Sequence, residues 1–382
     1  MLVQYAASRH QAYGICPHYF RNAMRKFFLL VGLAGLSSGA AWGQNAQQEA
    51  ETKAKEGVRL MDAGKLDESV ALLTQAHQLD PARSAITYEL GMAYYEQKNY
   101  PRATELLAPL VQLPEATDRT FELLGNVYDD SGQSAQAIAT YEAGLKRFPT
   151  SGRLDLELGI AHMRRKEYDQ ALGYYEAGIR DAPEFPSNYY WAARLYCSSD
   201  NEAWGMLYGE LFMNLERNSS RTVEISKLLY DTYKSQITFK GADTTVVSFA
   251  PTTVLLPAKG KPVLPFDGLV YEPVLTMATV GVKAIDLNSL DVVRRQFVEN
   301  YYRLPLAKKY PNVLFEYQRQ LLAAGQLEAY NHWLLMKGDE DAFIAWQKSN
   351  PFKWQSFTTW FQANPLKINK DHRFYRFQYD SQ

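Results

Sequence analysis

Cysteine is nearly absent from this 382-residue sequence, in which only Cys16 and Cys197 occur. Removal of an N-terminal leader would leave Cys197 as the single thiol, so an intramolecular disulfide is excluded in the processed chain. We expect Cys197 to be a buried, unreactive side chain within a helical core. Packing, and not disulfide bonds, must therefore stabilise the fold.

Acidic residues are missing from residues 1–43, whereas the basic residues Arg25 and Lys26 stand just past the middle of that segment. An apolar run follows these two basic residues, and small residues precede the Gly43-Gln44 bond. This order of a positive start, an apolar run and a small-residue site is typical of a secretory signal peptide. We expect cleavage near this bond, which would make the protein exported, either periplasmic or secreted.

A long apolar run is also lacking, because the run after Lys26 is too short to cross a bilayer comfortably. The alternative is an uncleaved anchor, and Met24 is an alternative start that would make residues 1–23 a start-site artefact. We expect no membrane span in the mature chain. Without residues 1–43 the chain would carry 37 basic and 42 acidic residues, a net charge of −5. That acidic balance argues against nonspecific nucleic-acid binding.

Catalytic and cofactor motifs are missing as well. The sequence contains no HExxH or cysteine cluster for a metal, no GxSxG nucleophile and no glycine-rich phosphate loop. We therefore predict no catalytic residues, no cofactor and no metal, and a chain that is not an enzyme. The alternative is an enzyme whose residues converge only in three dimensions, between the repeats described next and the C-terminal region.

A repeat of 34 residues is present instead. Its first position is glycine in every copy: Gly57, Gly91, Gly125 and Gly159. Twelve residues later each copy has a small side chain: Ser69, Ala103, Ala137 and Ala171. Sixteen residues after the glycine each copy has a large one: Leu73, Leu107, Tyr141 and Tyr175. A glycine inside a helix costs about 1 kcal/mol relative to alanine, so its recurrence indicates close contact between two backbones.

These residues resemble the tetratricopeptide repeat (TPR) family, over about a third of the chain. The resemblance implies pairs of antiparallel helices that stack into a superhelix, because one pair cannot bury its apolar face alone. By the same alignment, Gly144 and Gly178 should lie where one pair packs on the next. Gly173 is expected on an exposed face. The family's usual role implies binding of a protein or peptide and brings no catalytic apparatus.

The resemblance also implies a concave groove lined by the first helix of each pair. The candidate partner-binding residues are Tyr88, Met92, Tyr95, Glu96, Asn126, Asp129, Asp130, Arg153 and Arg164. They predict a wall that is apolar at one end, acidic in the middle and basic at the other end. Glu122 stands where relatives that clamp a C-terminal carboxylate have lysine, so we expect an extended or helical peptide with an apolar anchor and some basic charge. The acidic residues could instead form a solvated face.

The fold class predicted for the whole chain is mainly α: a TPR α-solenoid of about four units, a degenerate fifth unit with a capping helix, a short β-hairpin or loop segment and a C-terminal helical region. The domain boundaries are 1–43 for the N-terminal extension and signal peptide, 44–49 for a linker, 50–185 for four TPR units, 186–236 for the degenerate repeat and capping helices, 237–265 for the β-rich segment and 266–382 for the Trp-rich helical region. Residues 266–280 have helical spacing, although Pro273 leaves a strand open. A later helix is expected to begin with a cap at Asn288 or Ser289.

Four of the 7 tryptophans lie in the last region, at helical spacing with phenylalanines: Trp333, Trp346, Trp354 and Trp360. A small aromatic core is one interpretation, and a platform of exposed rings for glycan is the other. The leading functional hypothesis is a noncatalytic, exported adaptor that holds a protein or peptide partner of unknown identity. The alternative is a cell-envelope protein that binds glycan or peptidoglycan through the C-terminal aromatic residues.

Overall fold

The computed structural model describes residues 38–240, 244–251 and 265–379. Contacts divide the chain into two compact units, Met1–Arg165 and Lys166–Gln382, called unit 1 and unit 2 below. The division falls inside the range predicted for the fourth repeat. Most of the predicted signal peptide lies outside the described residues.

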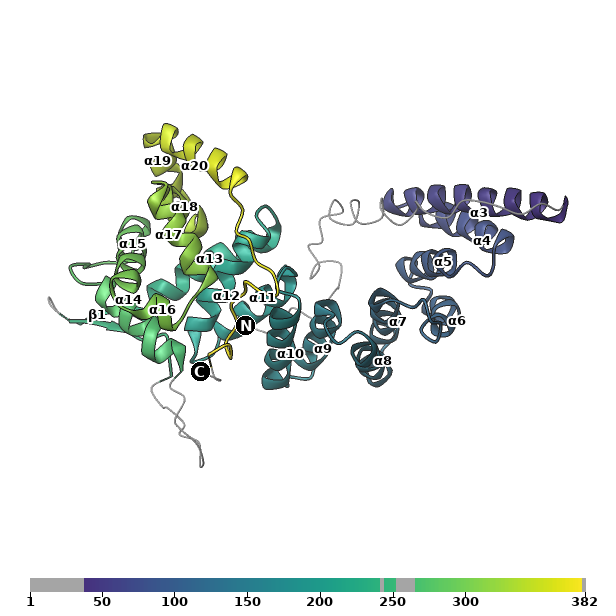
Figure 1. Ribbon diagram of the computed structural model, residues 1–382, viewed down its shortest axis with the longest axis horizontal. Helices are drawn as coiled ribbons and strands as arrows, with labels where there is room; N and C mark the ends of the chain where they lie inside the picture. Colours follow the sequence, from purple (N-terminus) through teal and green to yellow (C-terminus); the bar gives the residue numbers. More distant parts are fainter. Residues whose placement is uncertain (1–37, 241–243, 252–264, 380–382) are drawn as a thin grey trace, which may run out of the picture. The chain divides into compact units, whose positions relative to one another are not determined.

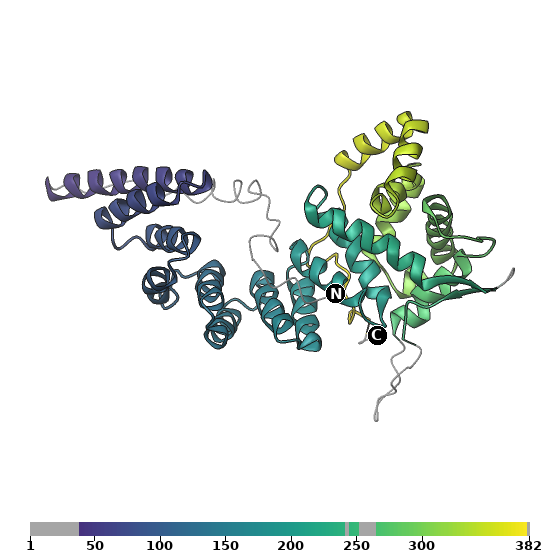
Figure 2. The same cartoon turned by 180° about the vertical axis from the view of Figure 1, so that it is seen from behind.

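Unit 1 consists of helices, and Figures 1 and 2 show its first six as successive antiparallel pairs. Their bounds are α3 Ser38–Asp62, α4 Leu66–Leu79, α5 Ser84–Glu96, α6 Tyr100–Leu110, α7 Asp118–Asp130, α8 Ser134–Arg147 and α9 Gly152–Arg164. Helix α3 contains the predicted cleavage site. Residues 44–49, expected to be a linker, are instead part of this helix, since their Ala and Gln residues favour helix. The predicted helical solenoid is confirmed.

The repeated glycines of unit 1 mark the points where the two helices of a pair touch. A Cβ atom added to Gly57 or Gly91 would lie 2.7 Å from the side chain of Leu73 or Leu107, respectively. At Gly125 the corresponding distance to Tyr141 Cε1 is 2.1 Å. The large side chain sixteen residues further along therefore lies directly on the glycine. This contact leaves no room for a Cβ atom, which explains why a poor helix former occupies these helical positions.

A second periodic feature lies in the turn inside each pair. Gly64, Lys98, Gly132 and Lys166 recur every 34 residues and have φ of 74°, 60°, 83° and 61°. This left-handed conformation is strained for residues with a Cβ and free of strain for glycine. The turn geometry is thus retained even where lysine occupies the position.

Contacts between successive pairs also use glycine, as predicted. A Cβ on Gly144 would lie 2.8 Å from both Leu154 and Phe121, which belong to α9 and α7. In unit 2, a Cβ on Gly178 would lie 2.2 Å from Asn188. Gly173, by contrast, has no atom within 4 Å of such a Cβ, in agreement with the exposed face predicted for it.

Unit 2 is also mainly helical. Its helices are α10 Tyr168–Asp181, α11 Pro186–Tyr196, α12 Glu202–Leu215, α13 Ser220–Gln236, η2 Asp267–Tyr271, α14 Glu272–Ala278, α15 Leu287–Arg303, α16 Leu306–Lys309, α17 Val313–Ala323, α18 Leu327–Leu335, α19 Glu340–Ser349 and α20 Pro351–Ala363. Its strands are β1 Ile237–Lys240 and β2 Thr244–Val247, an antiparallel pair that pairs Ile237 with Val247.

The pair α11–α12 continues the repeat in a degenerate form. Ala193 stands 34 residues after Gly159 and is fully buried. Twelve residues later, a Cβ on Gly205 would lie 2.4 Å from Cys197 Sγ. Burial raises the pKa of the Cys197 thiol to about 12, so this thiol stays protonated and unreactive near neutral pH.

Helix α13 follows this pair, and Leu229 packs onto Gly209 of α12. The helix was expected to cap the stack, but α18 also packs on α13. A Cβ on Gly338, in the turn after α18, would lie 1.9 Å from Tyr230 of α13. Helix α13 therefore covers the last helical pair of the stack, as predicted, and in addition contacts α18.

The later elements match the sequence pattern with one exception. Residues 267–278 are helical, because Pro273 falls in the first turn of α14, where the missing N–H costs little. Helix α15 was expected to start with a cap at Asn288 or Ser289, and this was wrong. Its N-cap is Asp286, whose Oδ1 accepts from Ser289 N at 2.7 Å. The remaining part of the predicted β-rich segment, residues 252–264, lies outside the described residues.

The C-terminal tryptophans contribute to a core. Trp333 and Trp346 are 7% and 9% exposed, and Phe357 and Phe361 are buried with them. Trp333 and Phe361 have ring centroids 4.7 Å apart. Trp346 stacks on His332 with centroids 4.2 Å apart. Trp333 and Trp346 therefore belong to an aromatic core, whereas Trp354 and Trp360 are partly exposed.

None of the helices in the described ranges combines the length and the apolar composition needed to cross a membrane.

Candidate functional site

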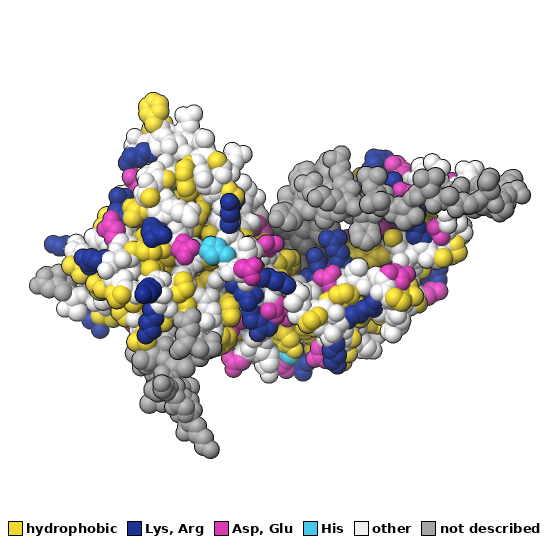
Figure 3. Space-filling view, in the orientation of Figure 1, with side chains coloured by type: hydrophobic (Ala, Val, Ile, Leu, Met, Phe, Trp, Pro, Cys, Tyr) yellow, Lys and Arg dark blue, Asp and Glu magenta, His cyan; other side chains and the backbone are white. Residues whose placement is uncertain are grey.

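The candidate groove residues lie on the first helices of the pairs in unit 1. Helix α5 carries Tyr88, Met92, Tyr95 and Glu96; helix α7 carries Asn126, Asp129 and Asp130; helix α9 carries Arg153 and Arg164. Most are partly buried, whereas Arg164 is exposed and Asp129 is buried. Figure 3 shows acidic, basic and apolar side chains intermixed over unit 1 on the face in view.

Hydrogen bonds of the candidate residues join α5 to α7 and α7 to α8. The Tyr95 hydroxyl donates to Asp130 Oδ2 at 2.6 Å. The Tyr141 hydroxyl donates to Asn126 Oδ1 at 2.6 Å, which fixes the ring that covers Gly125. Asn126 therefore holds the inside of one helical pair, while Tyr95 links one pair to the next.

Ion pairs join α7 to α9. Arg153 Nη1 donates to Glu122 Oε2 at 2.8 Å, and its Nε lies 3.3 Å from Asp118 Oδ2. Arg164 Nη1 donates to Asp129 Oδ2, and the Asp129 side chain is only 2% exposed. The acidic middle of the groove is therefore compensated by arginines of the next pair and is not a freely solvated face.

These contacts share one sequence spacing. Tyr95 and Asp130 are 35 residues apart, as are Asp129 and Arg164, and both pairs are one repeat plus one residue. Polar residues 35 positions apart in the sequence were therefore a signal from which both contacts could have been predicted. Five of the nine candidate residues thus link neighbouring helical pairs: Tyr95, Asp129, Asp130, Arg153 and Arg164.

The α5 end of the groove has a different character. Tyr88, Met92 and Tyr95 pack against a buried cluster that includes Leu123 and Leu124. Burial, reinforced by the Glu122 carboxylate, raises the pKa of Tyr88 far above its ordinary value, so its hydroxyl remains protonated. Tyr88 and Met92 therefore offer an apolar surface with one hydroxyl at the floor of the groove.

Sequence reasoning missed Glu89, which neighbours Tyr88 on α5. Burial raises the pKa of the Glu89 carboxyl to about 7; the Asp62 carboxylate of α3 adds to the shift and Arg119 of α7 opposes it. An unfolded glutamate titrates near pH 4.3. Folded protein therefore binds more protons than unfolded protein between about pH 4.5 and pH 7, and stability falls as pH rises through this window.

Replacing Glu89 by Gln should remove this pH dependence. At pH 8 we expect the variant to be more stable, with a free energy of unfolding about 1–2 kcal/mol above that of the wild type, after allowance for partial exposure of the group. At pH 4 the two proteins should be equal. Urea unfolding monitored by circular dichroism at both pH values measures the difference, and a constant offset across the range would contradict the titration.

Unit 2 contains a separate polar cluster around a buried ion pair. Arg294 Nη2 of α15 donates to Glu210 Oε1 of α12 at 2.6 Å, and the side chains are 6% and 5% exposed. The other guanidinium nitrogens donate to Asn331 Oδ1 at 2.7 Å and to the Tyr233 hydroxyl at 2.9 Å. Burial alone would lower the pKa of Arg294, but the Glu210 carboxylate outweighs it and keeps the guanidinium charged.

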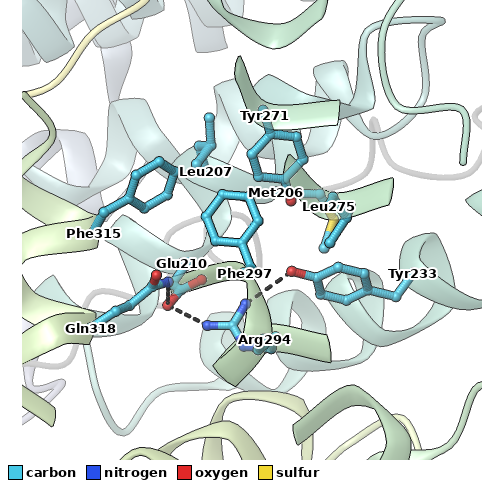
Figure 4. Close-up of a pocket in the computed structure, with 10 residues that line it drawn as sticks. All are labelled: Met206, Leu207, Glu210, Tyr233, Tyr271, Leu275, Arg294, Phe297, Phe315 and Gln318. Atoms are coloured by element: carbon cyan, nitrogen blue, oxygen red, sulfur yellow. Dashed lines mark hydrogen bonds and ion pairs between the residues drawn. The ribbon is translucent and has the colours of Figure 1, made fainter. Parts of the chain in front are cut away.

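A cavity adjoins this ion pair (Figure 4), with a volume of about 10 Å³. Its lining is Met206, Leu207, Glu210, Tyr233, Tyr271, Leu275, Arg294, Phe297, Phe315 and Gln318. This volume admits a molecule the size of water and no organic substrate. The cavity thus contains an ionised pair but offers no room for the chemistry of a larger molecule.

Groups of three or more His, Cys, Asp or Glu side chains that could hold a metal ion are not found within the part of the chain that the structure describes.

Comparisons with known proteins match the repeats. Models of the tetratricopeptide repeat match residues 60–114 and 123–186. Tetratricopeptide repeat protein 21B of Mus musculus is 33% identical over 66 residues, which is 17% of this chain and 5% of that protein. The human protein of the same name is 35% identical over 65 residues, again 5% of its length. This chain therefore matches only a small part of these relatives.

Solved structures with a similar fold include PilF of Pseudomonas aeruginosa, with a TM-score of 0.43 and 16% identity over 50% of this chain and 86% of that one. Another is YrrB, described as a TPR protein with an unusual peptide-binding site, with a TM-score of 0.34 and 15% identity over 48% of this chain and 94% of that one. The 34-residue period and the paired helices agree with the matched models, and residues 60–114 and 123–186 therefore contain tetratricopeptide repeats.

Proposed function

We propose that this chain is an exported, noncatalytic scaffold that binds a protein or peptide partner in the groove of unit 1. Tetratricopeptide repeats are protein-interaction scaffolds, which supports the general role. The observation that carries the specific site is the contrast inside the groove. The α7–α9 end uses its charges to join helical pairs, whereas Tyr88, Met92 and Glu96 of α5 remain available to a partner.

The character of the α5 end suggests the chemistry of that partner. Tyr88 and Met92 are suited to an apolar side chain, because Met is flexible and Tyr presents both an apolar face and a hydroxyl. Asp62 and Glu96 have no ion pair or hydrogen bond within the described residues, and each stands five residues after a repeat glycine, at positions 57 and 91. A peptide with an apolar anchor beside a basic residue fits this surface.

The groove can be tested by reversing its uncompensated charges. The double variant Asp62→Lys and Glu96→Lys should lower partner capture at least about tenfold, equivalent to about 1.4 kcal/mol. Glu142→Lys, on an exposed position of the second helix α8, is the matched control and should capture partners as the wild type does. Quantitative pull-down from envelope extracts compares the three proteins. Equal capture by all of them would contradict binding in the groove.

Export rests on residues 1–43, with their basic start, apolar run and small-residue site. We expect the protein recovered from cells to begin at Gln44. Mass spectrometry of the intact N-terminal peptide checks this. A recovered chain that still contains Phe27 and the rest of the apolar run would contradict cleavage and favour the anchor.

The cavity of unit 2 gives no support to a catalytic alternative, because its volume of about 10 Å³ excludes organic substrates. Burial of Trp333 and Trp346 takes two of the four C-terminal tryptophans away from a glycan platform, which leaves Trp354 and Trp360 partly exposed. Neither alternative is favoured by a specific observation in the described residues.

A further inference from the structure

The cavity beside the Glu210–Arg294 ion pair is lined by hydrogen-bond acceptors that the protein does not satisfy. Gln318 of α17 is 4% exposed, and its Nε2 donates to Glu210 Oε1 at 2.7 Å. Its Oε1 is buried and has no hydrogen-bond partner within the described ranges. A buried, unpaired carbonyl oxygen costs about 1–3 kcal/mol, so a donor from outside the protein would be stabilising here.

The Glu210 carboxylate supplies another acceptor to the cavity. Its Oε1 accepts from Arg294, Gln318 and the Tyr330 hydroxyl, at 2.6, 2.7 and 2.8 Å. Its Oε2 accepts none of the hydrogen bonds found among the described residues. Figure 4 shows this second oxygen on the side of the carboxylate that faces Phe297, among the residues that line the cavity.

The protein can also supply one donor to the cavity. Tyr233 and Tyr271 both line it. The Tyr233 hydroxyl accepts from Arg294 Nη1 at 2.9 Å. Because the Tyr233 hydroxyl is the acceptor in this bond, its own proton is available to the cavity. The lining thus presents two acceptors and one available donor.

We propose that the cavity binds one ordered water molecule, which donates to Gln318 Oε1 and Glu210 Oε2 and accepts from the Tyr233 hydroxyl. Water matches the site because it has two donor hydrogens and an acceptor oxygen, and because about 10–15 Å³ is the space that one buried water occupies. An anion is disfavoured by the carboxylate, and a cation by the neighbouring Arg294 guanidinium. The water completes the hydrogen bonding of an ion pair that ties α12, α13, α15, α17 and α18 together.

A crystal structure of the wild-type protein, at a resolution that shows ordered solvent, tests the site directly. We expect one density peak in the cavity, about 2.6–3.2 Å from both Gln318 Oε1 and Glu210 Oε2. A cavity without density overturns the proposal. A peak with several oxygen contacts of about 2.3–2.6 Å also overturns it, because that geometry belongs to a metal cation.

Two variants provide a second test in the same crystals. Gln318→Met retains side-chain length but removes the amide, and the peak should be lost. Tyr317→Phe changes the neighbouring residue on α17, whose hydroxyl donates outside the cavity to Asn364 O at 2.7 Å, and the peak should remain. Persistence of the peak at full occupancy in Gln318→Met contradicts the assigned ligands. If Gln318→Met does not fold, the wild-type density decides alone.

Discussion

Replacing Arg294 by Met should lower the free energy of unfolding of unit 2 by about 3–5 kcal/mol. The variant leaves the Glu210 carboxylate buried without its counter-charge, and it removes the donors that Asn331 and Tyr233 accept from. Losing one member of a buried ion pair is costly because the remaining charge stays out of water. This is the largest single effect that we expect from a side-chain change in the protein.

The next residue on the same helix provides the control. Arg295 donates to Asp291 Oδ2 at 2.9 Å, one turn away, and its side chain is 42% exposed. Arg295→Met should therefore cost at most about 1 kcal/mol. Urea unfolding followed by tryptophan emission reports on unit 2, since six of the 7 tryptophans lie there and Trp42 precedes the predicted cleavage site. Similar losses in the two variants would show that the ion pair does not hold unit 2 together.

Gly125→Ala is expected to destabilise unit 1 by about 1–3 kcal/mol, although alanine is the better helix former. The new Cβ would lie 2.1 Å from Tyr141 Cε1, so the ring has to move. Tyr141 is fully buried, and its hydroxyl is bonded to Asn126, so movement breaks a hydrogen bond as well as packing. Overpacking therefore outweighs the gain in helix propensity.

Gly173→Ala is the matched control, because Gly173 also lies inside a helix but has open space around it. We expect it to stabilise its helix by about 0.5–1 kcal/mol. Hydrogen exchange of peptides from α7–α8 and from α10 measures the two effects locally. Equal and favourable effects of both substitutions would contradict the close contact that we assign to the repeat glycines.

Much of unit 1 was predictable because its repeat imposes the same contacts at a fixed interval. The sequence indicates that Gly125 and Ala137 let two backbones approach and that Tyr141 fills the space beside them, and the structure places the Tyr141 ring directly on Gly125. The groove was harder to predict, because the sequence shows that Asp129 and Arg164 occupy groove positions but not that they pair with each other. Two charges one repeat apart can equally face a ligand, and only their geometry distinguishes the two arrangements.

The polar cluster of unit 2 lies outside the four regular repeats, so no sequence period reveals it. Glu210 and Arg294 are separated by 84 residues, and Glu210 and Tyr330 by 120. One signal was available: Glu210 is the only charged residue in the apolar stretch from Ala203 to Met213, and a charge in such a stretch requires a buried partner. The partner itself could not be predicted from the sequence, because Arg294 and Arg295 are adjacent and the sequence does not show which of the two side chains is buried.

The cross-links at the α7–α9 end of the groove also bear on the mechanics of unit 1. Arg164 holds Asp129, and Tyr95 holds Asp130, each from a neighbouring helical pair. A ligand that takes either carboxylate must first release the side chain that holds it, and the repeat array then becomes more compliant. A ligand confined to Tyr88 and Met92 leaves the array as stiff as before, so the elasticity of unit 1 under load would report which end is occupied.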